Sequence, residues 1–183
     1  MHTKYPNQHT TTTLHANIIH DFVRDPVNSY FVETGTNLGA GVDLALQLDF
    51  RSVISIEKDQ TFFEQASAKF KDNTRVRLHL GDSRNIMPTI CQEACLPCFF
   101  WLDAHYTDDT ESPLFHDLSS IVNRNYPHDI IAIDDIRLVR ERAQWGAKIT
   151  IGDITGIIGK KYHILYTDSR RNQNDILIGL RKN

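Results

Sequence analysis

The stretch that decides the fold of this 183-residue chain is Phe31-Val32-Glu33-Thr34-Gly35-Thr36-Asn37-Leu38-Gly39-Ala40-Gly41. It begins as a short apolar strand, passes through an acid and a glycine-rich turn, and leads into the helix-like run 42–48. This order builds a nucleotide-sized pocket at the carboxyl end of a first parallel strand. Three residues separate Gly35 from Gly39, so the spacing differs from the dinucleotide fingerprint G-x-G-x-x-G. Together with Glu33, this spacing favours a ligand that carries a cationic amine over one that carries a pyrophosphate.

Strands and helices are predicted to alternate on either side of this stretch. The polar residues 1–13 are expected to form a flexible arm, followed by a helix over 14–24. Further strands are expected at 30–33, 52–56, 75–80, 98–102 and 130–133, with helices at 38–48, 60–70, 84–91, 114–124 and 149–159. The runs 162–166 and 175–180 are joined by a polar turn without a helix, which indicates an antiparallel pair. We therefore expect one α/β domain over 14–183, a Rossmann-like three-layer sandwich whose seven-stranded, mostly parallel sheet ends in a C-terminal antiparallel hairpin.

The overall charge favours no polyanionic partner. The chain has 20 basic and 23 acidic residues and a formal net charge of −3. It therefore gives no electrostatic reason to expect nucleic acid or an anionic membrane as the main partner. No apolar run approaches the roughly 18 residues of a spanning helix, and the N-terminus lacks the apolar core of a signal peptide. The expected location is the cytoplasm.

The three cysteines, Cys91, Cys95 and Cys98, lie within eight residues of one another. An odd number at this spacing does not form a disulfide framework. The pattern C-x-x-x-C-x-x-C matches the cluster signature of radical S-adenosylmethionine enzymes, but here it lies mid-chain instead of in an early loop. We therefore expect buried or half-buried thiols and leave their role open.

Further acids follow the next predicted strands, where ligands bind in sheets of this kind. Glu57 lies 22 residues after Gly35 and is placed to accept hydrogen bonds from the two hydroxyls of a ribose. Gly81-Asp82-Ser83 follows the third strand and is placed to meet an adenine amine. A simpler interpretation stays open for each acid. Glu57 and Asp82 could each cap the N-terminus of the helix that follows it, without binding a ligand.

Taken together, these features resemble the class I S-adenosylmethionine-dependent methyltransferases, from about residue 28 to the end of the chain. The stretch 31–41 is similar to the first motif of that family, Ile56-Glu57 to its second and Gly81-Asp82 to its third. The resemblance also implies that the seventh strand inserts between the fifth and the sixth. It implies that Glu33 and the turn 35–39 hold the amino acid part of the donor, Glu57 the ribose and Asp82-Ser83 the adenine. The expected donor-binding positions are Glu33, Thr34, Gly35, Thr36, Asn37, Gly39, Glu57, Lys58, Gly81, Asp82, Ser83 and Asp103.

Three more acids, Asp103, Asp134 and Asp135, follow the fourth and fifth strands. Neighbouring parallel strands lie about 4.8 Å apart, so carboxylates at their ends can converge on one ion. Hard oxygen ligands with room for water suit Mg²⁺. The layout resembles the metal-dependent O-methyltransferases of the catechol and sugar types. Separate loop residues that bind solvent or cap helices are the alternative.

His105 is the candidate general base, and with Asp103 it makes up the expected catalytic pair. The unperturbed pKa of histidine lies near neutrality, and His105 is two residues from Asp103. A fourth metal ligand or an ordinary loop histidine are the other interpretations. The catechol enzymes carry a lysine near this point, whereas this chain has none between Asp103 and Asp135.

The sequence therefore predicts an enzyme that transfers a methyl group from S-adenosylmethionine, with Mg²⁺, to a hydroxyl of a small sugar-like or natural-product acceptor. The chain has almost no insertions that would cover a substrate, so the cleft is open or a second subunit of a homodimer closes it. Three alternatives stay open: a metal-independent methyltransferase, a non-catalytic S-adenosylmethionine- or nucleotide-binding module, and, less favoured, an NAD-linked oxidoreductase.

Overall fold

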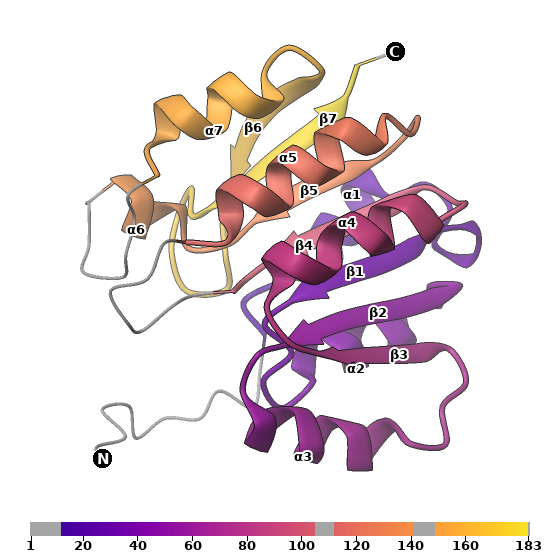
Figure 1. Cartoon of the computed structure of the whole chain (residues 1–183). Helices are drawn as coiled ribbons and strands as arrows, with labels where there is room; N and C mark the ends of the chain where they lie inside the picture. The colour runs from indigo at the N-terminus through magenta and orange to yellow at the C-terminus, as the bar shows by residue number, and fades with distance from the viewer. Residues whose placement is uncertain (1–11, 105–111, 141–148, 183) are drawn as a thin grey trace, which may run out of the picture.

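The computed structural model describes residues 12–104, 112–140 and 149–182, and all statements below concern these residues. Seven strands form one sheet in the order β3-β2-β1-β4-β5-β7-β6 (Figure 1). The strands are β1 (Tyr30–Thr34), β2 (Ser52–Glu57), β3 (Val76–Leu80), β4 (Cys98–Leu102), β5 (Ile130–Ile133), β6 (Tyr162–Thr167) and β7 (Ile176–Arg181). The helices are α1 (Ala16–Phe22), α2 (Ala40–Gln47), α3 (Gln60–Phe70), α4 (Ser83–Glu93), α5 (Leu114–Arg124), α6 (Ile136–Arg140) and α7 (Ile151–Ile158), with a 3-10 turn η1 (Pro26–Asn28).

The sheet has the topology expected from the sequence. Strands β1 to β5 are parallel, whereas β7 pairs antiparallel with both β5 and β6. The C-terminal hairpin and the insertion of β7 between β5 and β6 are therefore confirmed. Because five neighbouring strands run in one direction, all their carboxyl ends lie along one edge of the sheet.

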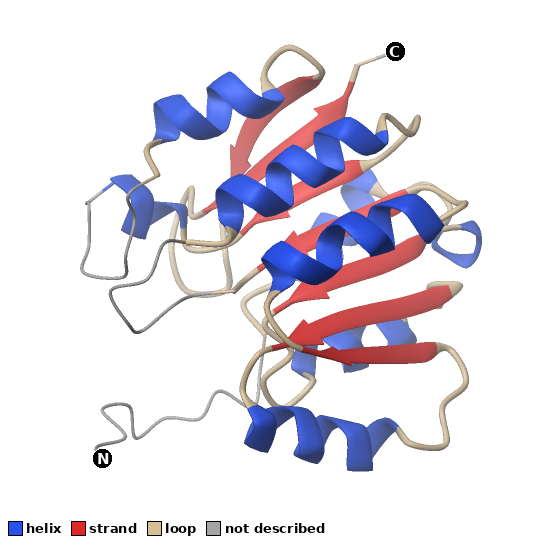
Figure 2. Ribbon diagram, in the orientation of Figure 1, coloured by secondary structure: helices blue, strands red, loops and turns tan. Residues whose placement is uncertain are grey.

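Helices cover both faces of the sheet and make three layers (Figure 2). Side chains alternate between the faces along each strand, so Phe31 packs with α1, α2 and α3, and Val32 packs with α4, α5 and α7. Both residues are fully buried. β4 and β5 have no exposed residue, which is typical of central strands covered on both sides.

The predicted boundaries agree best where the hydrophobic period is strong. The bounds of α3, β4, α5 and β5 are those predicted. Each of the other predicted elements begins and ends within two residues of the predicted position. The sequence prediction missed two short elements, η1 and α6. Of the arm predicted at 1–13, residues 1–11 lie outside the described residues. Within the described part of the chain, no helix has the length and apolar character needed to cross a membrane.

Candidate functional site

The glycine turn after β1 depends on backbone angles that suit glycine. Gly35 has φ of 87° and Gly39 has φ of 76°, both in the left-handed region. A Cβ atom on Gly35 would lie only 2.8 Å from the carbonyl oxygen of Asp103, at the end of β4. The Gly35 amide also donates to the carbonyl of Ile56 at the end of β2 (2.9 Å). The turn is thus held between the ends of the two strands that flank β1.

Glu33 lies beneath this turn and is only 2% exposed. Its Oε2 accepts a hydrogen bond from the Ser55 hydroxyl at 2.7 Å. A Cβ atom on Gly41 would come within 1.8 Å of its Oε1, so the first turn of α2 leaves room for this carboxylate only because a glycine stands there. Burial raises the pKa of Glu33 to about 8, against the opposing effect of the Ser55 hydrogen bond. Without a ligand, the carboxyl group is therefore mostly protonated at neutral pH.

Glu57 links the end of β2 to the glycine turn. Its Oε2 accepts from the Asn37 amide at 2.7 Å and its Oε1 accepts from the Asp59 amide at 2.8 Å. Each carboxylate oxygen has a second lone pair, so both can accept a further hydrogen bond from a ligand hydroxyl. The cap of α3 is Asp59, whose carboxylate accepts from the amides of Thr61 and Phe62. Glu57 therefore does not cap α3.

Asp82 is the N-cap of α4, in line with the simpler of its two interpretations. Its carboxylate accepts from the Arg84 amide at 3.0 Å and forms an ion pair with the Arg84 guanidinium at 2.7 Å. Both carboxylate oxygens thus have partners within the chain. The adjacent Ser83 is 4% exposed and donates its hydroxyl hydrogen to Asp117 of α5 at 2.8 Å. Lys58, another expected donor contact, is exposed.

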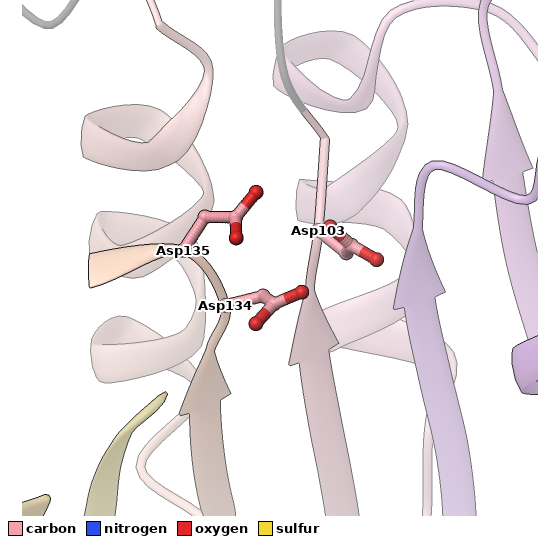
Figure 3. Close-up of side chains that lie close together, drawn as sticks. All are labelled: Asp103, Asp134 and Asp135. Carbon is pink, nitrogen blue, oxygen red and sulfur yellow. The ribbon is translucent and has the colours of Figure 1, made fainter. Parts of the chain in front are cut away.

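The three acids after β4 and β5 converge as the sequence predicts. Asp103, Asp134 and Asp135 each offer a carboxylate oxygen, and these atoms lie within 4.8 Å of one another (Figure 3). Within the described residues, no other group of three acids, histidines or cysteines has this proximity.

Asp134 is the buried member of this acid cluster, only 4% exposed. Its Oδ2 accepts a hydrogen bond from the Thr13 hydroxyl, whereas its Oδ1 is buried and has no hydrogen-bond partner among the residues that the structure describes. Burial first, and then the charges of Asp103 and Asp135, raise the pKa of Asp134 to about 8. An unpartnered carboxylate oxygen among two further acids is an arrangement that a cation would stabilise.

Asp135 already has a cationic neighbour. Its backbone lies in the left-handed region, with φ of 51°, and its carboxylate forms an ion pair with Arg137. The same guanidinium also pairs with Asp175, the residue just before β7. Arg137 thus joins the acid cluster to the C-terminal hairpin.

The donor set of the cluster fits a magnesium ion. Three carboxylates offer hard oxygen ligands, and one of their oxygens, Asp134 Oδ1, accepts no hydrogen bond from any described residue. The residues able to hold the ion are Asp103 and Asp134, with Asp135 shared with Arg137. His105 lies outside the described residues, so its predicted role as a base stays a prediction.

The three cysteines lie toward the opposite edge of the sheet, near the start of β4. Cys91 and Cys98 are buried and Cys95 is exposed. Burial raises the pKa of Cys91 to about 12, and it raises the pKa of Cys98 as well. Both buried thiols are therefore protonated and unreactive at neutral pH.

Two residues of the site were not predicted from the sequence. Thr13, which contacts Asp134, is held in place by the Arg170 amide, which donates to its carbonyl oxygen at 3.1 Å. Asp117 is 1% exposed and lines a cavity of about 50 Å³ beside the acid cluster. The residues around this cavity are Thr34, Leu102, Ala104, Ser112, Pro113, Leu114, Asp117, Ile133, Asp134, Asp135, Leu138, Val139 and Ile149.

Sequence comparison alone does not place the chain, because no family model and no curated protein matches it. Comparison with solved structures does place its fold. The O-methyltransferase TomG from Streptomyces achromogenes, solved with S-adenosylmethionine, aligns with a TM-score of 0.63 at 15% identity over 91% of this chain and 78% of its own. An O-methyltransferase from Bacillus cereus, solved with S-adenosylhomocysteine, aligns with a TM-score of 0.62 at 17% identity, over 90% and 79% of the two chains.

A third similar structure is CalS10, an amino pentose methyltransferase from Micromonospora echinaspora, solved with S-adenosylmethionine. It aligns with a TM-score of 0.62 at 10% identity, over 91% of this chain and 88% of its own. The fold of the chain is that of the class I S-adenosylmethionine-dependent methyltransferases. The motifs at the strand ends predicted a resemblance to this family, and the comparisons confirm the fold that this resemblance implies.

Proposed function

We propose that this protein is a methyltransferase that uses S-adenosylmethionine and Mg²⁺ to methylate a hydroxyl oxygen of a small hydroxylated acceptor. The observation that carries the proposal is the convergence of two features at one edge of the sheet. The turn 35–39, with Glu33 beneath it and Glu57 beside it, lies at the ends of β1 and β2. The acid cluster lies at the ends of β4 and β5, and Asp103 touches both features because its carbonyl oxygen faces Gly35.

In this proposal Glu33 and Glu57 bind different parts of the methyl donor. Glu33 is buried below the turn, and it becomes ionised when the cationic amine of the donor binds beside it. Glu57 offers a lone pair on each carboxylate oxygen to the ribose hydroxyls. When bound, S-adenosylmethionine supplies an electrophilic methyl group on its sulfonium. These contacts contribute to catalysis by holding that methyl group in line with the acceptor oxygen.

The acid cluster has the task of orienting the acceptor. Asp103 and Asp134 would hold the metal ion, which lowers the pKa of a bound hydroxyl when present. Thr13 holds one oxygen of Asp134 by a hydrogen bond, and the other oxygen has no partner within the described residues. Because Arg137 neutralises part of the charge of Asp135, a divalent cation would meet mainly the charges of Asp103 and Asp134.

The experiment that tests the proposal has two parts. Calorimetric titration with S-adenosylhomocysteine reports the donor site, and no binding of this compound or of S-adenosylmethionine would leave only a non-catalytic role. Methyl transfer to a panel of diols is then measured with Mg²⁺ and with EDTA. We expect activity to require the metal and to fall by about 100-fold or more in Asp134→Asn. Activity that survives both EDTA and this substitution would favour the metal-independent alternative.

A further inference from the structure

Asp117 is a buried acid on the apolar side of α5. The inward-facing residues of this helix are Leu114, Asp117, Leu118 and Ile121. Asp117 is 1% exposed, and its Oδ2 accepts the hydrogen bond from Ser83 at 2.8 Å. Its Oδ1 is buried and has no hydrogen-bond partner within the described residues. A buried oxygen of this kind is unfavourable when it is left unpaired, so its presence calls for a partner.

No cation of the described residues forms an ion pair with this carboxyl group. The charge of Asp82 raises the pKa of Asp117 and that of Arg84 lowers it, and these two residues are already joined in an ion pair with each other. Burial raises the pKa of Asp117 to about 7, while the hydrogen bond from Ser83 acts against the increase. A cationic ligand beside Asp117 would therefore form an ion pair with a carboxylate that has no ion-pair partner among the described residues.

The cavity beside Asp117 has a suitable size and lining for such a ligand group. Its volume is about 50 Å³. This space admits roughly three or four groups the size of a water molecule, such as a short aminoalkyl chain. Apolar side chains, among them Leu138 and Ile149, form much of the wall, and Asp134 and Asp135 of the acid cluster also line it. One ligand can thus reach Asp117 and the acid cluster together.

We propose that Asp117 is an amine-binding residue of the acceptor site. Its Oδ1 accepts a hydrogen bond from a protonated amine of the acceptor inside the cavity, while the acceptor's hydroxyls lie against the acid cluster. This inference rests on the proposed function, and it narrows the acceptor to a hydroxylated amine. Asp134 and Asp135 could compete for the amine, but the metal and Arg137 engage these two acids in the loaded protein.

The test uses two ligands that differ only in the group that would meet Asp117. Dopamine carries an amine where hydroxytyrosol carries a hydroxyl, and both carry the same adjacent ring hydroxyls. Each is titrated calorimetrically into the full-length protein loaded with Mg²⁺ and S-adenosylhomocysteine. We expect dopamine to bind at least about tenfold more tightly, because hydrogen bonds to charged groups are the stronger ones. Equal affinities, or no binding of dopamine, would overturn the inference.

Two variants show whether Asp117 is responsible. Asp117→Asn keeps an oxygen that can accept the Ser83 hydrogen bond but removes the charge, so we expect it to abolish the preference for dopamine. The control is Asp72→Asn, which removes a carboxylate that is 89% exposed just past the end of α3, and it should keep the preference. A preference that persists in Asp117→Asn would assign the amine to another group. The wild-type comparison stands even if Asp117→Asn does not fold, and the S-adenosylhomocysteine titration reports the donor site separately.

Discussion

At the scale of single residues, the site depends on Glu33, an acid that the fold keeps away from water. It is 2% exposed, and its ordinary pKa is raised to about 8 by burial. A ligand with a cationic amine favours the ionised form, so binding releases a proton at neutral pH. We therefore expect the affinity for S-adenosylhomocysteine to increase between about pH 6 and about pH 8.

Calorimetry over this pH range checks the prediction, with Glu33→Gln as the matched variant because it keeps the shape and cannot ionise. The variant should bind more weakly, and its affinity should change less with pH. A wild-type affinity that is constant from about pH 6 to about pH 8 would show that Glu33 does not sense the amine.

Gly41 is the residue that leaves room for Glu33. A Cβ atom at this position would lie 1.8 Å from Glu33 Oε1, a distance that forces the carboxylate or α2 to move. We expect Gly41→Ala to destabilise the protein by about 1–3 kcal/mol and to weaken S-adenosylhomocysteine binding. Urea unfolding and calorimetry measure the two effects.

Gly156 of α7 provides the matched control for Gly41. A Cβ atom there would meet nothing within 4 Å, so Gly156→Ala should stabilise the protein by about 0.5–1 kcal/mol through its better helix propensity. The two substitutions are chemically the same and differ only in their surroundings. Similar effects of both would show that Glu33 is not packed against α2 as described.

At the scale of elements, the segment before α1 completes the site from a distant part of the chain. Thr13 and Asp134 are 121 residues apart in sequence, and a hydrogen bond from the Thr13 hydroxyl joins them. The next residue, Leu14, is fully buried and anchors the segment in the core. This contact holds the carboxylate of Asp134 in one orientation at the end of β5.

We therefore expect Thr13→Val to weaken Mn²⁺ binding by about 10- to 100-fold, because it keeps the shape of the side chain and removes its hydroxyl. Thr13→Ser keeps the hydroxyl and should bind the ion nearly as the wild type does. Titration followed by electron paramagnetic resonance measures both affinities. Equal affinities in the two variants would show that the hydrogen bond does not support the cluster.

Some helices and site residues could be predicted from the sequence, and others could not. The bounds of α3 and α5 were predicted because each is long, and α5 carries a regular apolar stripe. The five residues of α6 bury only Ile136, so they leave no period to detect. The acids at the ends of β4 and β5 were predicted because parallel strands end at one edge, whereas contacts such as that of Thr13 depend on packing across the whole chain. Asp117 did leave a signal, since it is an acid within the apolar stripe of α5.

At the scale of the whole molecule, the fold buries several acids near one edge of the sheet, and the raised pKa values of three of them have a consequence for stability. Burial raises the pKa of Glu33 and Asp134 to about 8 and that of Asp117 to about 7, from ordinary values of 4.5, 3.8 and 3.8. At a pH between the ordinary pKa values and these raised ones, the three acids are ionised in the unfolded chain but protonated in the folded protein. The folded protein therefore binds more protons than the unfolded chain does. The free energy of unfolding therefore decreases as the pH rises through this window.

We expect the protein without metal or donor to lose stability steadily from about pH 5 to about pH 7, by up to about 1.4 kcal/mol per pH unit for each of these acids. Urea unfolding at a series of pH values in the presence of EDTA measures the slope. Glu33→Gln and Asp117→Asn should each make the slope shallower, because each removes one group that takes up a proton on folding. Mg²⁺ and S-adenosylhomocysteine should restore stability at about pH 7, since they favour the ionised carboxylates. Stability that is constant or increases from about pH 5 to about pH 7 would mean that these acids are ionised in the folded protein, and that the buried charge at this edge of the sheet is compensated from within the chain.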